Sequence, residues 1–145
     1  VSGQEEGARI VVGGGKVQGE RFEHGFFVEP TLFDEVKPDM RIAQEEIFGP
    51  VLSTISFVDP DEAVEIANGT KYGLAASIWT NDLRRAVRVA KGIQAGQVYV
   101  NTYGWSSVVG APFGGYKSSG FGRTHVFETI LDYTQVKSVI ISAED

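Results

Sequence analysis

The sequence predicts an α/β fold in which parallel β-strands are joined by α-helices. Two observations predict this fold. Three short apolar runs between residues 51 and 101 alternate with two segments of helical periodicity, and each helical segment begins with a capping signal and ends at a glycine. A β-α-β-α-β order of this kind implies parallel strands linked by right-handed crossovers.

The amino-terminal part contains two extended regions. The run from Arg9 to Val12 predicts a strand that ends at the glycines 13–15. These glycines do not form a dinucleotide-binding fingerprint, because Gln18 stands where a third glycine is required. The segment from Phe26 to Val36 is rich in strand-forming residues but contains Pro30, so we expect two extended pieces joined by a bend.

The first strand–helix pair is the most clearly marked. Residues Val51 to Phe57 predict a strand. Asp59 then caps a helix, Pro60 takes the first helical position, and Glu62 has the spacing of a capping box. Asn68-Gly69 ends this helix.

The second pair repeats this arrangement. Leu74 to Trp79 predicts a strand, and Asn81 or Asp82 caps a helix that stops at Gly92. Val98 to Asn101 predicts the third strand. Ligands of parallel sheets usually bind beyond the carboxyl ends of the strands, so topology alone directs attention to the loop after Asn101.

The last third of the chain is less regular. A loop with two large aromatic side chains follows Asn101, and a glycine-rich segment covers residues 110–122. Residues 124–133 predict a helix, and residues 136–142 predict a strand with alternating apolar side chains.

Composition describes an ordinary globular protein and excludes several classes. The chain has 145 residues, of which 42% are hydrophobic and 22% charged. A net charge of −6 argues against a nucleic-acid partner, which would require clustered positive charge. No apolar run approaches the length of a membrane span, and no signal-peptide pattern is present, so we expect a cytoplasmic protein without a membrane partner. The absence of cysteine excludes disulfides and thiolate metal sites within these residues, and we expect no bound metal.

The segment Gln44-Glu45-Glu46-Ile47-Phe48-Gly49-Pro50 combines acidic and aromatic side chains. A carboxylate can accept hydrogen bonds from both hydroxyls of a ribose, and an aromatic ring two residues later can stack on a heterocycle. The residues alone leave a simpler alternative open, a solvated acidic turn before the strand that starts at Val51.

Several separated motifs resemble, in order and spacing, the carboxyl-terminal part of the NAD(P)-dependent aldehyde dehydrogenase superfamily. They are Gly25 to Phe33, Met40 to Val51, Tyr72 to Ala76, Val98 to Asn101, Pro112 to Gly120, Gly122-Arg123 and Tyr133 to Val139. The resemblance covers essentially the whole chain. It implies the later part of a Rossmann-related catalytic domain over residues 1–133, and an oligomerisation strand and tail over residues 134–145 that builds homodimers or homotetramers.

The same resemblance implies a reaction, and it implies that some of the catalytic residues lie outside this chain. Members of the superfamily oxidise an aldehyde to a carboxylic acid with NAD or NADP, through a cysteine thiolate that forms an enzyme thioester. Because this chain has no cysteine, it cannot carry out that step alone. We therefore expect a fragment of a longer enzyme whose nucleophile and general base lie upstream. The alternative is a non-catalytic structural or interaction protein derived from an aldehyde dehydrogenase.

Residue roles follow from the matched motifs. Glu46 resembles the glutamate that binds the nicotinamide ribose, and Phe48 resembles the aromatic residue beside the nicotinamide. Phe113 matches an aromatic residue near the substrate channel, although a core phenylalanine remains an equal alternative. The segment that lines substrate entry in the family corresponds here to Tyr103, Trp105 and Val109, whose side chains can equally pack on a neighbouring subunit.

Four further polar residues are assigned simpler roles. Lys117 has the amine for a Schiff base, but nothing in the sequence indicates the lowered pKa that this would need. Asn101 either donates a hydrogen bond to a ligand or ends its strand. His24 and His125 are expected to be surface residues, because they form no ligand cluster with recognisable spacing.

Two positions depart from the superfamily pattern. Thr124 stands where a glutamate is frequent after the Gly-Arg pair, and Val126 stands where a glycine is frequent. A valine restricts the backbone more than a glycine does, so the path into the last helix is expected to differ in this chain.

Overall fold

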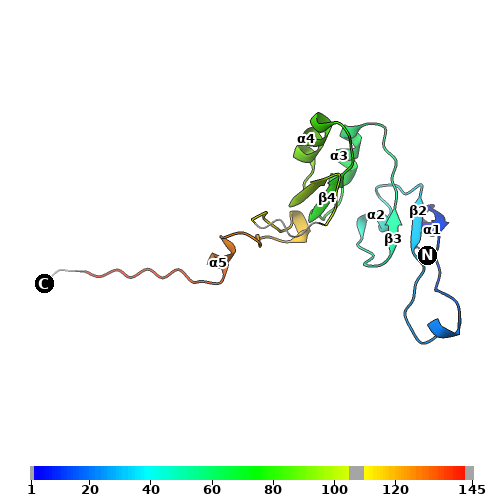
Figure 1. Ribbon diagram of the computed structural model, residues 1–145, viewed down its shortest axis with the longest axis horizontal. Coiled ribbons are helices and arrows are strands. Elements are labelled where there is room, and N and C mark those ends of the chain that lie inside the picture. The colour runs from blue at the N-terminus through cyan, green and yellow to red at the C-terminus, as the bar shows by residue number, and fades with distance from the viewer. Residues whose placement is uncertain (1, 105–109, 143–145) are drawn as a thin grey trace. The chain divides into compact units, whose positions relative to one another are not determined.

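The protein is described by a computed structural model that covers residues 2–104 and 110–142 (Figure 1). Trp105 and Val109 therefore lie outside the described residues. By internal contacts the chain divides into two compact units, Val1–Lys71 and Tyr72–Asp145.

The first unit contains a three-stranded mixed sheet. Strand β2 (Thr31–Asp34) lies in the centre, antiparallel to β1 (Arg9–Val12) and parallel to β3 (Val51–Ser53). Phe33 of β2 is 2% exposed and packs with Met40 and Ile42 at the start of α2 (Arg41–Gln44). The short helix α1 (Ser2–Glu5) packs close to α2, where a Cβ on Gly3 would lie 2.8 Å from Ile42 Cδ1.

An ion-pair cluster links the first two strands of this sheet. Arg9 donates to Asp34 at 2.6 Å and to Glu35 at 2.9 Å. The backbone N–H of Glu35 and the hydroxyl of Thr54 lower the pKa of the Asp34 carboxyl below its ordinary value, and the Arg9 guanidinium adds to the effect. All these groups are largely exposed, so the cluster fixes the β1–β2 register more than it stabilises the fold.

The strands predicted before residue 102 are present, but two of them are shorter than predicted. The extended region around Pro30 is divided as expected, with an isolated bridge between Lys16 and Val28 before β2 begins. The strand predicted at residues 51–57 ends at Ser53. It pairs in parallel with β2, which lies 20 residues back in the sequence. The partner of this strand could not be read from the order of elements, because strand pairing is decided by tertiary packing.

Helix α3 (Pro60–Asn68) begins as its sequence predicts. Asp59 Oδ1 accepts hydrogen bonds from the backbone N–H groups of Asp61 and Glu62, both at 2.9 Å. The Glu62 carboxylate accepts from the N–H of Val58 at 2.6 Å, one residue before the cap. Two carboxylates thus pair two N–H groups of the first helical turn and the N–H of the residue just before the cap.

Replacement of Asp59 by alanine is expected to lower the free energy of unfolding by about 1 kcal/mol, since the first turn of α3 loses its cap. Thermal unfolding of the complete protein measures this change. Glu65→Ala is the matched control, because Glu65 is an exposed acidic residue in the middle of the same helix. Equal melting temperatures for the two variants would contradict the capping role.

The second unit contains the predicted parallel pair. Strand β4 (Ala75–Ile78) runs parallel to β5 (Gln97–Val100), and α4 (Leu83–Gly92) connects them. Of the two predicted caps, Asp82 is the one used, and its Oδ1 accepts from the N–H of Arg85 at 3.1 Å. Ala86, which is 2% exposed, lies on the buried side of this helix. The parallel strands and mixed α/β architecture predicted for the chain are confirmed.

The segment after β5 has little regular structure. A 3-10 turn covers Lys117–Ser119, and the helix predicted over residues 124–133 is reduced to α5 (Thr129–Asp132). The predicted strand over residues 136–142 is fully described, and none of its residues belongs to a strand. It continues from α5 as an extended segment in Figure 1 with its apolar side chains exposed, Val136 at 99% and Ile140 at 94%. Within the described residues, no helix has the length and hydropathy that a membrane crossing requires.

Candidate functional site

The loop between α2 and β3 carries the acidic and aromatic residues singled out in the sequence. Its carboxyl end is tied to the sheet, because the N–H of Thr31 donates to the carbonyl of Pro50 at 2.8 Å where β2 and β3 begin. The loop therefore lies at the amino ends of two parallel strands. Ligands of parallel sheets usually bind at the carboxyl ends of the strands, so this rule does not predict a site in the loop between α2 and β3.

Glu45 and Glu46 are adjacent but have different surroundings. Glu45 Oε2 accepts a hydrogen bond from Arg41 Nε at 2.7 Å, one helical turn earlier. This hydrogen bond and the charge of Glu45 raise the pKa of Arg41 above its ordinary value. The Glu46 carboxylate, in contrast, is exposed and bonds to no other residue in the described part of the chain. Glu46 is thus the carboxylate whose acceptor sites are available to a ligand.

Phe48 has an unusual backbone and an unusual environment. Its φ of 51° lies in the left-handed region, which costs a non-glycine residue about 1–3 kcal/mol. Phe48 is 92% exposed, so none of the described residues covers the ring. A strained backbone that presents an uncovered aromatic ring is typical of a residue that meets a ligand or another part of a protein.

A cavity of about 720 Å³ lies beside this loop in the first unit. It is lined by the loop together with segments far away in the sequence. These are Gly14 to Lys16, Val28, Glu29 and Thr31, with Ser2, Phe33, Arg41 and Ile42. A second hollow of about 320 Å³ involves Ile42, Glu45 to Gly49, Val51 and Ser53. Both volumes are within the range of small-molecule sites.

The glycine turn before β2 forms part of this cavity wall, which sequence reasoning missed. The N–H of Gly14 donates to Thr31 Oγ1 at 2.9 Å, and the N–H of Gly15 donates to Glu29 Oε2 at 3.2 Å. A Cβ on Gly13 would lie 2.2 Å from the carbonyl oxygen of Pro30. The run of three glycines was the available signal, since such a run permits close backbone approach.

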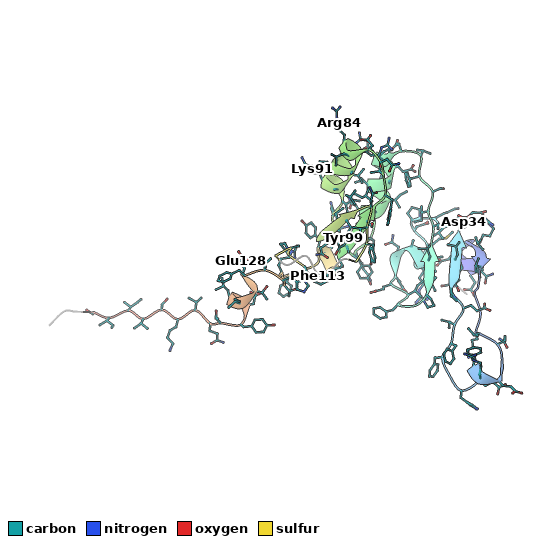
Figure 2. The ribbon with its side chains drawn as sticks, in the orientation of Figure 1. Asp34, Arg84, Lys91, Tyr99, Phe113 and Glu128 are labelled. Carbon is teal, nitrogen blue, oxygen red and sulfur yellow. The ribbon has the colours of Figure 1, made fainter. Side chains whose placement is uncertain are left out.

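The second unit holds the other described site residues. Phe113 is half-buried and forms an isolated antiparallel bridge with Thr124, through hydrogen bonds of 3.0 and 2.8 Å. Tyr103 is 69% exposed, and its ring meets that of Tyr99 edge to face with centroids 6.1 Å apart. Figure 2 labels Tyr99 on β5 and Phe113 in the segment after it.

Asn101 has the simpler of its two predicted roles. Its Nδ2 donates to the carbonyl of Thr80 at 2.9 Å, and its Oδ1 accepts from the N–H of Thr80 at 2.9 Å. The side chain, at a backbone φ of 54°, therefore joins the ends of β4 and β5. No group of carboxylates and imidazoles within the described residues is arranged to hold a metal ion.

The structure therefore defines an α/β protein with parallel strands, in which a free carboxylate and an uncovered aromatic ring line a cavity of ligand size. The sequence comparison makes the assignment specific. The chain belongs to the aldehyde dehydrogenase family, whose model matches residues 1–139.

Individual relatives agree with this assignment. A betaine aldehyde dehydrogenase from Brucella anthropi is 45% identical over 139 residues, which cover 96% of this chain and 28% of the relative. A solved structure of a mutant indole-3-acetaldehyde dehydrogenase AldA from P. syringae, in complex with NAD+ and IAA, is 48% identical to this chain with a TM-score of 0.86. The match covers 95% of this chain and 27% of the AldA chain. A Mycobacterium tuberculosis aldehyde dehydrogenase complexed with NAD+ is 45% identical with a TM-score of 0.86 and covers 97% and 28%. The chain thus spans less than a third of the length of these relatives.

Proposed function

We propose that this chain is the part of an NAD(P)-dependent aldehyde dehydrogenase that holds the nicotinamide ribose and forms part of the substrate tunnel. The reaction is the oxidation of an aldehyde to a carboxylic acid through an enzyme thioester. The observation that carries the proposal is the unpaired Glu46 carboxylate, which lines the same cavity as the exposed ring of Phe48.

The residues present suit a nicotinamide cofactor. Glu46 would accept hydrogen bonds from the ribose hydroxyls, and Phe48 would lie against the flat nicotinamide. When bound, the cofactor supplies the acceptor for hydride. Arg41 donates a hydrogen bond to Glu45, so of the two adjacent carboxylates Glu46 is the one that is free to accept from the ribose. Solved relatives are complexes with NAD+, and for this chain the cofactor is NAD or NADP.

The remaining chemistry comes from outside residues 1–145. None of these residues is a cysteine, so the thiolate nucleophile and its general base belong to another segment of the same enzyme. The substrate tunnel is assigned to Phe113 and Tyr103 in the second unit, and to Trp105 and Val109 beyond the described residues. Domain organisation follows the same scheme, with catalytic-domain residues 1–133 followed by an oligomerisation segment, residues 134–145.

Assembly into a homodimer or homotetramer is part of the proposal. Residues 136–142 are extended, carry the exposed apolar side chains of Val136, Val139, Ile140 and Ile141, and form no strand with the described residues of their own chain. An edge of this kind is stabilised when it pairs with a strand of a second copy. We further propose that the enzyme acts in the cytoplasm on an aldehyde substrate, without a nucleic-acid or membrane partner.

A second function is favoured by one observation. The lack of cysteine would also suit a non-catalytic structural or interaction protein derived from an aldehyde dehydrogenase. The gene sequence upstream of Val1 separates the two, since a cysteine-bearing catalytic segment supports the enzyme and a start codon near Val1 supports the alternative.

The complete polypeptide is expected to reduce NAD+ or NADP+ when an aldehyde is added, as followed by absorbance of the reduced nicotinamide. Residues 1–145 alone are expected to show no turnover, because no thiolate is present. If the complete polypeptide binds the cofactor but oxidises none of a panel of aliphatic and aromatic aldehydes, the enzymatic proposal is wrong.

A further inference from the structure

The ring of Phe113 has a neighbour that no sequence motif indicated. The imidazole of His125 lies with its centroid 5.6 Å from that of Phe113, and the two planes are tilted by 31°. This separation is within the range of stabilising aromatic pairs. His125 is exposed, as the sequence predicted, and its ring also meets Phe113, an aromatic residue that the motifs place near the substrate channel.

The backbone brings the two rings together. Phe113 and Thr124 exchange both backbone hydrogen bonds, so the residue after Thr124 starts beside the Phe113 ring. His125 has a φ of 64°, in the left-handed region, which histidine adopts more readily than most residues with a Cβ. The backbone of His125 is therefore strained at the position where its imidazole meets the phenyl ring of Phe113.

Contacts on either side hold this arrangement in place. Arg123 Nη1 donates to the carbonyl of Gly115 at 3.1 Å, and its guanidinium lies 5.5 Å from the centre of the Tyr116 ring. Thr129 Oγ1 donates to the carbonyl of Arg123 at 3.2 Å, which connects the turn to α5.

The same segment is tied to β5. Tyr99 donates its hydroxyl to Gln97 Oε1 at 2.7 Å, and Gln97 Nε2 donates to the carbonyl of Pro112 at 3.4 Å. Tyr99 also meets the ring of Tyr103. Gln97 and Tyr99 are two apart on a strand, so they share one face, and this face supports both aromatic residues assigned to the tunnel.

We propose that His125 is a positioning residue that fixes the ring plane of Phe113, and that the fixed ring selects planar aromatic aldehydes over small aliphatic ones. The inference rests on the proposed function, because it assumes that Phe113 faces the substrate. A phenyl ring held in one orientation offers a flat apolar surface to an aromatic substrate without a further loss of side-chain entropy. A short aliphatic aldehyde gains little from that surface.

The test uses the complete enzyme, with phenylacetaldehyde and propanal as substrates. His125→Leu replaces the imidazole with a branched aliphatic side chain and so removes the ring, and we expect KM for phenylacetaldehyde to rise about fivefold with kcat within about twofold. KM for propanal is expected to stay unchanged. His125→Phe retains a ring that can stack and is expected to keep the preference for phenylacetaldehyde. His24→Leu is the matched control, because His24 is the other histidine of the chain and is exposed in the first unit.

Three results would overturn the inference. The first is a parallel change, or no change, for both substrates in His125→Leu. The second is a His125→Phe variant that behaves like His125→Leu. The third is a loss of soluble protein in both His125 variants but not in His24→Leu, which would assign His125 a structural role only. Failure of the unmodified enzyme to oxidise any aldehyde is a different result, since it refutes the proposed function and this inference together.

Discussion

Replacement of Glu46 by alanine in the complete enzyme is expected to slow hydride transfer about 10- to 100-fold, the equivalent of one strong charge-assisted hydrogen bond. The carboxylate bonds to no other described residue, so its removal leaves no group of this chain unpaired. The free energy of unfolding is therefore expected to change little. Single-turnover kinetics with a saturating aldehyde measures the hydride-transfer rate directly.

Glu45→Ala is the matched control for this experiment. Glu45 is the adjacent acidic residue, and its removal breaks the ion pair with Arg41. Both side chains of that pair are more than half exposed, at 62% and 53%, so the loss of stability is expected to be at most about 1 kcal/mol. Hydride transfer should stay close to the unmodified rate. The assignment of Glu46 fails if the two variants transfer hydride equally fast.

Replacement of Gly96 by alanine is expected to destabilise the protein by about 3 kcal/mol or more. An added Cβ would lie 1.6 Å from the carbonyl oxygen of Gly114 and 2.8 Å from its carbonyl carbon. Both are backbone atoms, so a rotation of a side chain cannot relieve the overlap. The segment that carries Phe113 would have to move away from β5.

Thermal or urea unfolding measures this effect, with Gly49→Ala as the control. An added Cβ on Gly49 meets no atom within 4 Å, and its φ is not in the left-handed region. Near-wild-type stability of Gly96→Ala would show that residues 110–116 are not packed on the start of β5. A soluble Gly96→Ala protein is also expected to lose its preference for aromatic aldehydes, because the Phe113 ring is displaced.

Local signals in the sequence were sufficient for much of the second unit and for helix α3. Asp59 and Asp82 cap the two longest helices, and the strands on either side of α4 pair in parallel as predicted. These features depend on residues close together in the chain, where hydrogen-bonding and periodicity rules are reliable. The i,i+4 spacing of Arg41 and Glu45 is also a local signal, and it would have identified Glu45 as the paired carboxylate.

Amino-acid order by itself determined the family and the starts of helices α3 and α4, and it predicted Glu46 as the ribose-binding carboxylate. Each of these depends on neighbouring residues or on a set of short motifs. Only the tertiary structure decided that β3 pairs with β2, that Gly14 and Gly15 line the Glu46 cavity, and that the His125 ring lies against Phe113. Each of these contacts joins segments separated by loops of variable path, and the position of such a contact is set by the packing of the whole chain and not by local preference.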